Sequence, residues 1–145
     1  MCGRCVADNE NGTVTDNLTG LIWLKNANCA ATRNWATALS DVVALNSDGE
    51  MNSNNCGDTS NSSSHQTDWR LPNLREMQSL IDYGRSGPAL PSGHPFTGVR
   101  SSNYWSSTTY ADDTSVAWDV SLDDGYVSGG GKAGTNYVWP VRGGQ

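Results

Sequence analysis

The sequence is poor in the residues from which aliphatic cores and basic surfaces are built. Only 36% of its 145 residues are hydrophobic, 17% are charged, and phenylalanine occurs once. No apolar run approaches the ~18 residues that cross a bilayer, which excludes direct insertion into a membrane. Met1 is followed at once by Cys2, without the basic and apolar stretches of a signal peptide, so we expect none at this start.

Lysine and arginine are also scarce. The chain has 9 of them against 15 aspartates and glutamates, which gives a formal net charge of -6. Binding to phosphate groups requires clustered Lys and Arg side chains. The charge balance therefore disfavours nucleic acid and anionic membrane surfaces as partners, and we expect no binding to nucleic acid.

Tryptophan, tyrosine and glycine are plentiful by contrast. There are 6 Trp, 5 Tyr and 16 Gly residues, and Asn, Ser, Thr and Asp are frequent. This composition predicts a core built on indole rings and a chain with many turns. The length suits one domain over residues 1–145, in which we expect 1–11 to be a loosely ordered N-terminal segment.

The 4 cysteines, at positions 2, 5, 29 and 56, predict disulfide chemistry rather than a metal centre. One Cys-x-x-Cys followed by two isolated cysteines is a poor match to the paired spacing of zinc ribbons. We favour a Cys29–Cys56 bond, because it would join the two ends of a helix-containing segment and hold a polar loop. Cys2 and Cys5 are expected to pair with each other or with a partner outside this sequence.

Short runs of β-branched, aromatic and apolar residues predict strands. The predicted strands are 12–16, 21–24, 104–107, 116–122 and 137–142. The first two form a hairpin, and the last should pair with it, because neither would be stable alone. Turns join the later strands, one of them over 128–134, while 47–66 and 85–103 are predicted to be loops. With two helices, this pattern indicates an α+β fold with antiparallel strands.

Two helices are predicted, over residues 35–46 and 73–83. Asn34 and Asn73 precede them as N-caps, and a glutamate three residues after Asn73 nearly completes a capping box. Gly84 is expected to end the second helix as a left-handed C-cap. The helices should pack on the hairpin sheet through four apolar side chains: Trp35, Leu39, Leu74 and Ile81.

Three blocks of sequence resemble the Lcl-type C-terminal domain family. They are residues 12–23 (GTVTDNLTGLIW), residues 68–82 (DWRLPNLREMQSLID) and closing segments at 104–110, 117–118 and 137–144. The resemblance implies a C-type lectin-like fold, with two helices packed on twisted antiparallel sheets and long irregular loops. It also implies an extracellular or bacterial cell-surface location, because the collagen-like founder of the family is a surface adhesin that trimerises and binds sulfated polysaccharides.

Some members of that family are diversified by retroelements, which rewrite Asn codons at adenines. Such codons commonly become Asp, Ser, Gly, Tyr, Thr, Ala or Asn, and 21 of the 27 positions in 110–136 carry one of these residues. The exceptions include alternating positions of the predicted strand, such as Val120 and Leu122. The resemblance thus implies a variable face on a fixed scaffold, and the alternative is an ordinary sheet with loops rich in Gly and Asp.

The expected function is binding without catalysis, through a ligand face within 110–136. Val120 and Leu122 should point inward, whereas Asp119 and Ser121 should point outward. Tyrosine anchors among Asp and Ser side chains suit a neutral or basic ligand, either a protein or a glycan. A glycan-binding adhesin without diversification is the alternative, and assembly into a homo-oligomer is left open. The predicted ligand-binding residues are Tyr110, Asp112, Asp113, Ser115, Val116, Asp119, Ser121, Asp123, Asp124, Tyr126, Ser128, Gly129, Gly130, Gly131, Ala133, Gly134, Thr135 and Asn136.

No catalytic residue, cofactor or metal is predicted. His65 and His94 stand alone in polar loops, without a recognisable nucleophile or orienting group. The formylglycine-generating enzymes, a distant fold relative, need C-terminal cysteines that this chain lacks after Cys56. Calcium is the alternative for the aspartates of 110–136, but the sugar-binding triplets of calcium-dependent lectins are absent, which favours solvated turn carboxylates.

The tryptophans divide into two groups. Four of them lie in apolar patterns or family blocks and are assigned to the core: Trp23, Trp35, Trp69 and Trp105. Trp118 and Trp139 lie on C-terminal strands near the proposed face and are candidates for partial exposure, since Trp is enriched where partners bind. A sulfated polymer is disfavoured as ligand, because 110–136 contains one Lys and no Arg.

Overall fold

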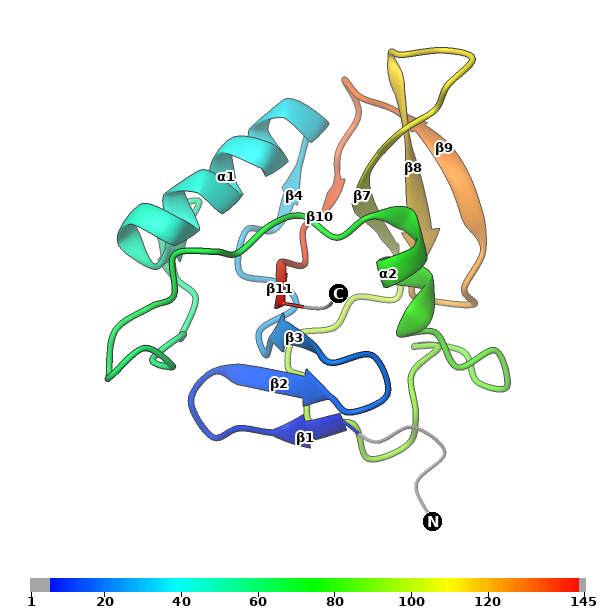
Figure 1. The fold of residues 1–145 in the computed structure, drawn as a ribbon. Coiled ribbons are helices and arrows are strands. Elements are labelled where there is room, and N and C mark those ends of the chain that lie inside the picture. Colours follow the sequence, from blue (N-terminus) through cyan, green and yellow to red (C-terminus); the bar gives the residue numbers. More distant parts are fainter. Residues whose placement is uncertain (1–5, 144–145) are drawn as a thin grey trace.

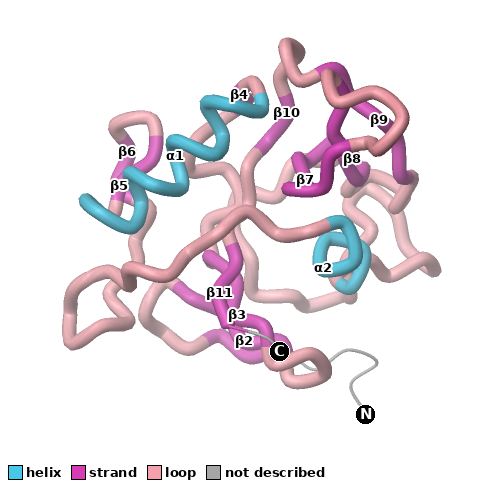
Figure 2. The backbone as a smooth tube through the Cα atoms, turned by 45° about the horizontal axis from the view of Figure 1, so that its top comes forward, coloured by secondary structure: helices cyan, strands magenta, loops and turns pink. Residues whose placement is uncertain are grey.

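A computed structural model describes residues 6–143 as a mixed α+β fold (Figure 1). Two sheets form its frame, with strand orders β1-β2-β3-β11 and β4-β10-β7-β8-β9, beside a small β5-β6 hairpin. In Figure 2, α1 and α2 lie on opposite sides of the view, and a long loop that follows the β5-β6 hairpin runs across the middle of the molecule to α2. The elements are β1 (Val6–Asp8), β2 (Thr13–Asp16), β3 (Leu21–Leu24), β4 (Thr32–Arg33), α1 (Trp35–Asp48), β5 (Glu50–Met51), β6 (Asn54–Asn55), α2 (Leu74–Ser79), β7 (Asn103–Thr109), β8 (Val116–Ser121), β9 (Val127–Gly131), β10 (Asn136–Tyr137) and β11 (Val141–Gly143).

The predicted N-terminal hairpin is confirmed, and the end of the chain pairs with it. β2 and β3 are antiparallel, and β11 adds to β3 with Val141 opposite Trp23. The predicted strand 137–142 is nevertheless two strands in different sheets, because β10 pairs with β4 and β7 instead. Residues 138–140, all buried, carry the chain from one sheet to the other.

Trp139, within that crossing, lies at the centre of an aromatic cluster. Its ring centroid is 5.5 Å from that of Trp23, 4.8 Å from Phe96 and 5.4 Å from Tyr104. Its indole N–H donates to the Leu24 carbonyl at 2.8 Å, so the one polar atom of this buried ring has a partner. Trp139, a candidate for partial exposure, is instead fully buried, and the prediction of an indole core is confirmed.

The other tryptophans assigned to the core lie where the sequence placed them. Trp23, Trp69 and Trp105 are buried, and Trp35 is half-buried against the core. The helices do not take the hairpin sheet as their main neighbour, however. α2 contacts β7 and β8 of the five-stranded sheet, and α1 contacts β5.

Both helices begin at the predicted caps but end elsewhere. The Asn34 side chain accepts from the Thr37 N–H, and α1 runs two residues further than predicted before Gly49 ends it in a left-handed conformation. α2 has the full capping box of Asn73, yet it ends at Ser79. Gly84 is not its C-cap, because the chain turns away earlier and the Asp82 N–H bonds to the Ala89 carbonyl at 2.8 Å.

A pair of arginines ties the central block to the last strand. The Arg70 guanidinium bonds to both carboxylate oxygens of Glu76, at 2.6 and 2.7 Å, and to the Gly143 carbonyl at 2.9 Å. The Arg70 backbone exchanges two hydrogen bonds with Val141, both 2.9 Å. Arg142 in turn pairs with Asp68 at 2.6 Å. The central and closing blocks of the sequence therefore act as one structural unit.

Three segments predicted to be irregular contain strands. Part of 1–11 is ordered, because β1 pairs with β2; Cys2 and Cys5 lie outside the described residues. The polar loop 47–66 contains the β5-β6 hairpin, anchored by the fully buried Met51. The turn predicted over 128–134 is largely the edge strand β9, whose glycines pair with β8.

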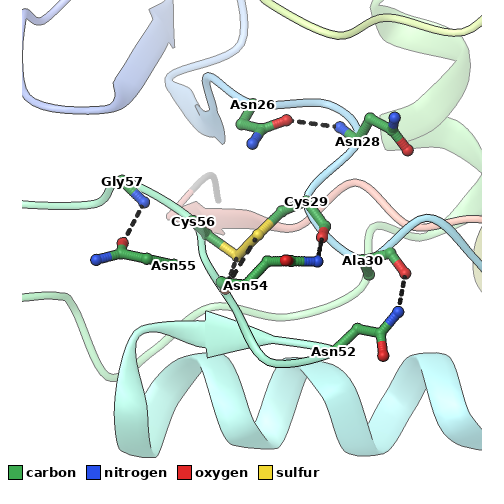
Figure 3. The surroundings of a disulfide bond; sticks show 9 residues. All are labelled: Asn26, Asn28, Cys29, Ala30, Asn52, Asn54, Asn55, Cys56 and Gly57. Carbon is green, nitrogen blue, oxygen red and sulfur yellow. Dashed lines mark hydrogen bonds between the residues drawn. A yellow bond between two sulfur atoms is a disulfide. The ribbon is translucent and has the colours of Figure 1, made fainter.

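The predicted disulfide is present. Cys29 and Cys56 are joined with an S–S distance of 2.01 Å, and both are buried. Figure 3 shows asparagine side chains bonded to the backbone around it: Asn54 Nδ2 donates to the Cys29 carbonyl at 2.9 Å, and Asn52 Nδ2 to the Ala30 carbonyl at 3.0 Å. Amide side chains of the β5-β6 hairpin thus join it to the backbone of residues 29–30.

Removing this cross-link should destabilise the domain. In the chain-entropy description, a loop of this length contributes ~3–4 kcal/mol, so the double variant Cys29→Ala, Cys56→Ala should lose about that much unfolding free energy. Urea unfolding followed by tryptophan fluorescence measures the loss. Cys2→Ala, Cys5→Ala is the matched control, and an equal loss in both variants would contradict the expectation.

Candidate ligand-binding face

The predicted ligand residues occupy the outer half of the five-stranded sheet. β8 lies between β7 and β9, and β9 is the edge strand. At one end of β8, the loop 110–115 lies beside the loop 132–135, held by a 2.8 Å bond from the Lys132 N–H to the Ser115 carbonyl (Figure 1). At the other end, a turn over 122–126 joins β8 to β9. We call these the loop end and the turn end.

Most of the predicted residues are exposed, but they lie in two groups rather than on one continuous face. At the loop end and along β9, the exposed residues are Asp112, Asp113, Ser115, Gly129, Gly131, Ala133, Gly134 and Thr135. At the turn end, they are Asp123, Asp124 and Tyr126. The half-buried ones are Tyr110, Val116, Ser121, Ser128, Gly130 and Asn136.

The strand β8 separates scaffold from surface, with one departure from the prediction. Val120 and Leu122 are fully buried, as expected. Asp119, expected to face outward, is only 2% exposed. Its side of β8 is covered as well, because the buried Trp105 lies opposite it on β7 and Ser128 lies opposite it on β9. The alternation of side chains along a strand predicts that β8 has two faces, but it does not predict that both faces are buried by neighbouring residues.

Asp119 is held by neutral donors. Ser128 Oγ donates to one carboxylate oxygen at 2.6 Å, and Asn136 Nδ2 donates to the other at 3.2 Å. No ion pair reaches Asp119 among residues 6–143. Burial raises the pKa of Asp119, and the two hydrogen bonds offset this only in part. Asp119 therefore supports the sheet from within instead of contacting a ligand.

The exposed aspartates order the loops that carry them. Asp113 Oδ1 accepts from the Ser115 N–H at 3.0 Å and from its hydroxyl at 2.6 Å, and these bonds hold the pKa of Asp113 below its ordinary value. At the turn end, Asp124 Oδ1 accepts from the Tyr126 N–H at 2.9 Å. Such turns are typical of solvated Asp side chains.

The loop end also contains a small cavity. Tyr110 and Trp118 line it together with Asp113, Val116 and Gly129, and its volume is about 330 Å³. Trp118 is half-buried, in keeping with the sequence analysis. Here an aromatic surface and the exposed carboxylate of Asp113 meet in one cavity.

The two histidines lie in separate cavities, each of about 210 Å³. His65 Nδ1 lies 2.9 Å from the Gln66 carbonyl. His94 Nδ1 is buried, and burial lowers the pKa of this ring. Within the part of the chain that the structure describes, no group of three or more His, Cys, Asp or Glu side chains could hold a metal ion.

One exposed aromatic residue beside the turn end was missed by the sequence analysis. Tyr83 is 65% exposed, and a Cβ built on Gly125 would lie 2.8 Å from its ring. The sequence placed Tyr83 at the end of a helix, whereas the shortened α2 leaves it in the following loop. Tyr83 therefore places a second exposed aromatic ring beside Gly125, the residue that precedes Tyr126.

Comparison with protein families gives a match over most of the chain. A protein-family model described as the Lcl C-terminal domain matches residues 12–142, a span that includes both helices and every strand except β1 and the last residue of β11. No curated protein matches the chain.

Two neighbouring glycines of β9 should differ sharply in their tolerance of a side chain. A Cβ on Gly130 would lie 2.6 Å from Asp119 Oδ2, whereas one on Gly131 would meet nothing within 4 Å. Gly130→Ala should lower the unfolding free energy by about 1–3 kcal/mol through overpacking. Gly131→Ala, the control, should leave thermal unfolding unchanged, and equal effects of the two substitutions would argue against this packing.

Neutralising Asp119 should change how stability depends on pH. The folded pKa is raised, so at neutral pH the ionised group destabilises the native state, and protonation relieves this as the pH falls through that pKa. Asp119→Asn should therefore be more stable than the wild type near pH 7, by about 1 kcal/mol. The difference should disappear on acidification, as followed by melting temperature. Parallel curves for the two proteins down to pH 3 would contradict the assignment.

Proposed function

Since this chain belongs to the Lcl C-terminal domain family, we propose that it is a non-enzymatic ligand-binding domain that presents residues 110–136 to a partner. The observation that carries the proposal is the division of that segment into buried and exposed positions. Asp119, Val120 and Leu122 belong to the scaffold, while the connecting loops expose most of their side chains. Loops held by a rigid sheet can change their side chains without disturbing the core.

The charge of this surface favours a neutral or basic ligand. Aspartates are exposed at both ends of β8, and Tyr126 is 69% exposed. Lys132, the one cation of 110–136, lies 4.0 Å above the Trp35 ring and donates to Thr109 Oγ1 at 2.9 Å. Because this ammonium group is already engaged, the segment offers little to sulfated polysaccharides or other polyanions.

We extend the proposal to diversification by a retroelement. The adenine-derived residue types of 110–136 are abundant at the exposed positions, and the exceptional Val120 and Leu122 are buried. Packing would limit the variation, because side chains at Gly129 and Gly130 would approach their neighbours within 2.9 and 2.6 Å. A near-copy of the coding region for 101–145 in the flanking genome, differing only where it has adenine, would support this. A flanking sequence without such a copy would favour the alternative, an adhesin domain without diversification.

The proposed fold and location follow the same family membership. Two helices, sheets that are antiparallel except for the parallel pair β10 and β7, and a last strand paired with the first hairpin support a C-type lectin-like fold. The Cys29–Cys56 disulfide supports an extracellular or cell-surface location, where such bonds persist. No helix in residues 6–143 has both the length and the apolar character to cross a bilayer.

The proposal is tested first by incubating the purified domain on arrays of proteins and of glycans. A protein partner is the expected result, and a bound neutral glycan would favour the adhesin alternative. A domain that binds nothing on either array but turns over a substrate would contradict the proposal.

Exchange of exposed residues should then separate binding from folding. The triple variant Asp112→Ser, Asp124→Ser, Tyr126→Ser should weaken binding of the array partner more than about tenfold, since few contacts usually carry most of the affinity. Its melting temperature should stay within ~2 °C of the wild type, because surface substitutions cost little. The matched control is Val43→Ser, Asp48→Ser, Glu50→Ser, three exposed positions around the end of α1. Unfolding of the first variant, or equal binding by both, would contradict the proposed face.

A further inference from the structure

An aromatic corner lines the cavity at the loop end. The rings of Tyr110 and Trp118 meet edge to face, with centroids 5.0 Å apart and planes at 87°. Both residues are half-buried, and both line the cavity of about 330 Å³. The corner is therefore fixed by packing and accessible to a group of about the size of one side chain.

The glycines of the edge strand keep this corner uncovered. Gly129 lies opposite Trp118 across the β8-β9 ladder, and Gly131 lies opposite Val116. Directly opposed residues usually cover each other with their side chains. Neither glycine has a side chain to do so, and a Cβ on Gly129 would come within 2.9 Å of Val116 Cγ1. The open cavity thus depends on the glycine-rich sequence of β9.

The charges at the cavity are negative. The exposed Asp113 lines it, and the hydrogen bonds from Ser115 to its Oδ1 keep the carboxylate ionised at neutral pH. Asp112 is exposed next to it. Lys132 is held over Trp35 by its contacts with that ring and with Thr109, so its charge is already engaged elsewhere.

We propose that this cavity receives a lysine or arginine side chain of a protein partner, which rests on the function proposed above and assigns its first subsite. A cation is attracted to the face of an aromatic ring, and Trp is the strongest such partner. Asp113 would pair with the same cation at the rim. A sugar would need one broad ring face, whereas two rings at 87° enclose a compact group from two sides.

The test uses single amino-acid probes and the isotope-labelled domain. N-acetyl-arginine amide and N-acetyl-lysine amide should shift the indole N–H signal of Trp118 saturably, with a dissociation constant on the order of millimolar for so small a contact. The shift should weaken as salt is added. N-acetyl-citrulline amide, N-acetyl-norleucine amide and methyl glucoside are the neutral probes, and they should leave the signal in place.

Two variants locate the binding. Asp113→Asn keeps an oxygen acceptor for Ser115 but removes the charge. It should therefore weaken the binding of the basic probes about tenfold. Tyr110→Leu should remove the preference for the basic probes over the neutral ones. Asp48→Asn is the control, because it removes the same charge at the end of α1, across the molecule from β8 (Figure 1).

The outcomes separate this inference from the proposed function. Equal shifts by neutral probes, binding of the glucoside instead, or unchanged binding in Asp113→Asn would overturn the cation site. An array partner that Tyr110→Leu retains and the triple surface variant loses would overturn the cation site alone. A partner that survives both changes would overturn the ligand face itself.

Discussion

The burial of Trp139 is the constraint on which the rest of the fold depends. The chain leaves the five-stranded sheet after β10, buries this indole, and enters the four-stranded sheet at β11. Its contacts with Trp23, Phe96 and Tyr104 come from three other parts of the chain. A large ring with a satisfied N–H can therefore replace the aliphatic core that this sequence lacks, and both sheets share it.

Because both sheets contribute to one core, the connections at the two ends of β8 are free to serve as surface. β8 contributes Val120 to the interior and Trp118 to a half-buried position, while its two connections are exposed. Asp119 shows the limit of this freedom, since its carboxylate is buried between Ser128 and Asn136 and contributes to the sheet itself. The residues open to change are therefore those of the loops rather than those of the strand.

Local patterns in the sequence predicted some helices and strands correctly and gave no indication of others. The capping residues Asn34 and Asn73 fixed where the helices begin, because a cap acts within one turn. The polar strand β9 has no apolar alternation, and it is a strand only because β8 pairs with it. The division of 137–142 between two sheets and the burial of Asp119 likewise depend on partners distant in sequence, which no local pattern encodes.

The pairing of β3 with β11 has a consequence for the order in which the domain can form. Trp23 and Val141 are neighbours in the sheet but lie near opposite ends of the chain. Bringing such distant segments together costs conformational entropy before the contact between them can stabilise the fold. Folds dominated by such pairings therefore fold slowly, in about milliseconds to seconds. During synthesis, one edge of β3 stays unpaired until β11 has been made. The nascent domain is thus exposed to edge-to-edge association for most of its translation.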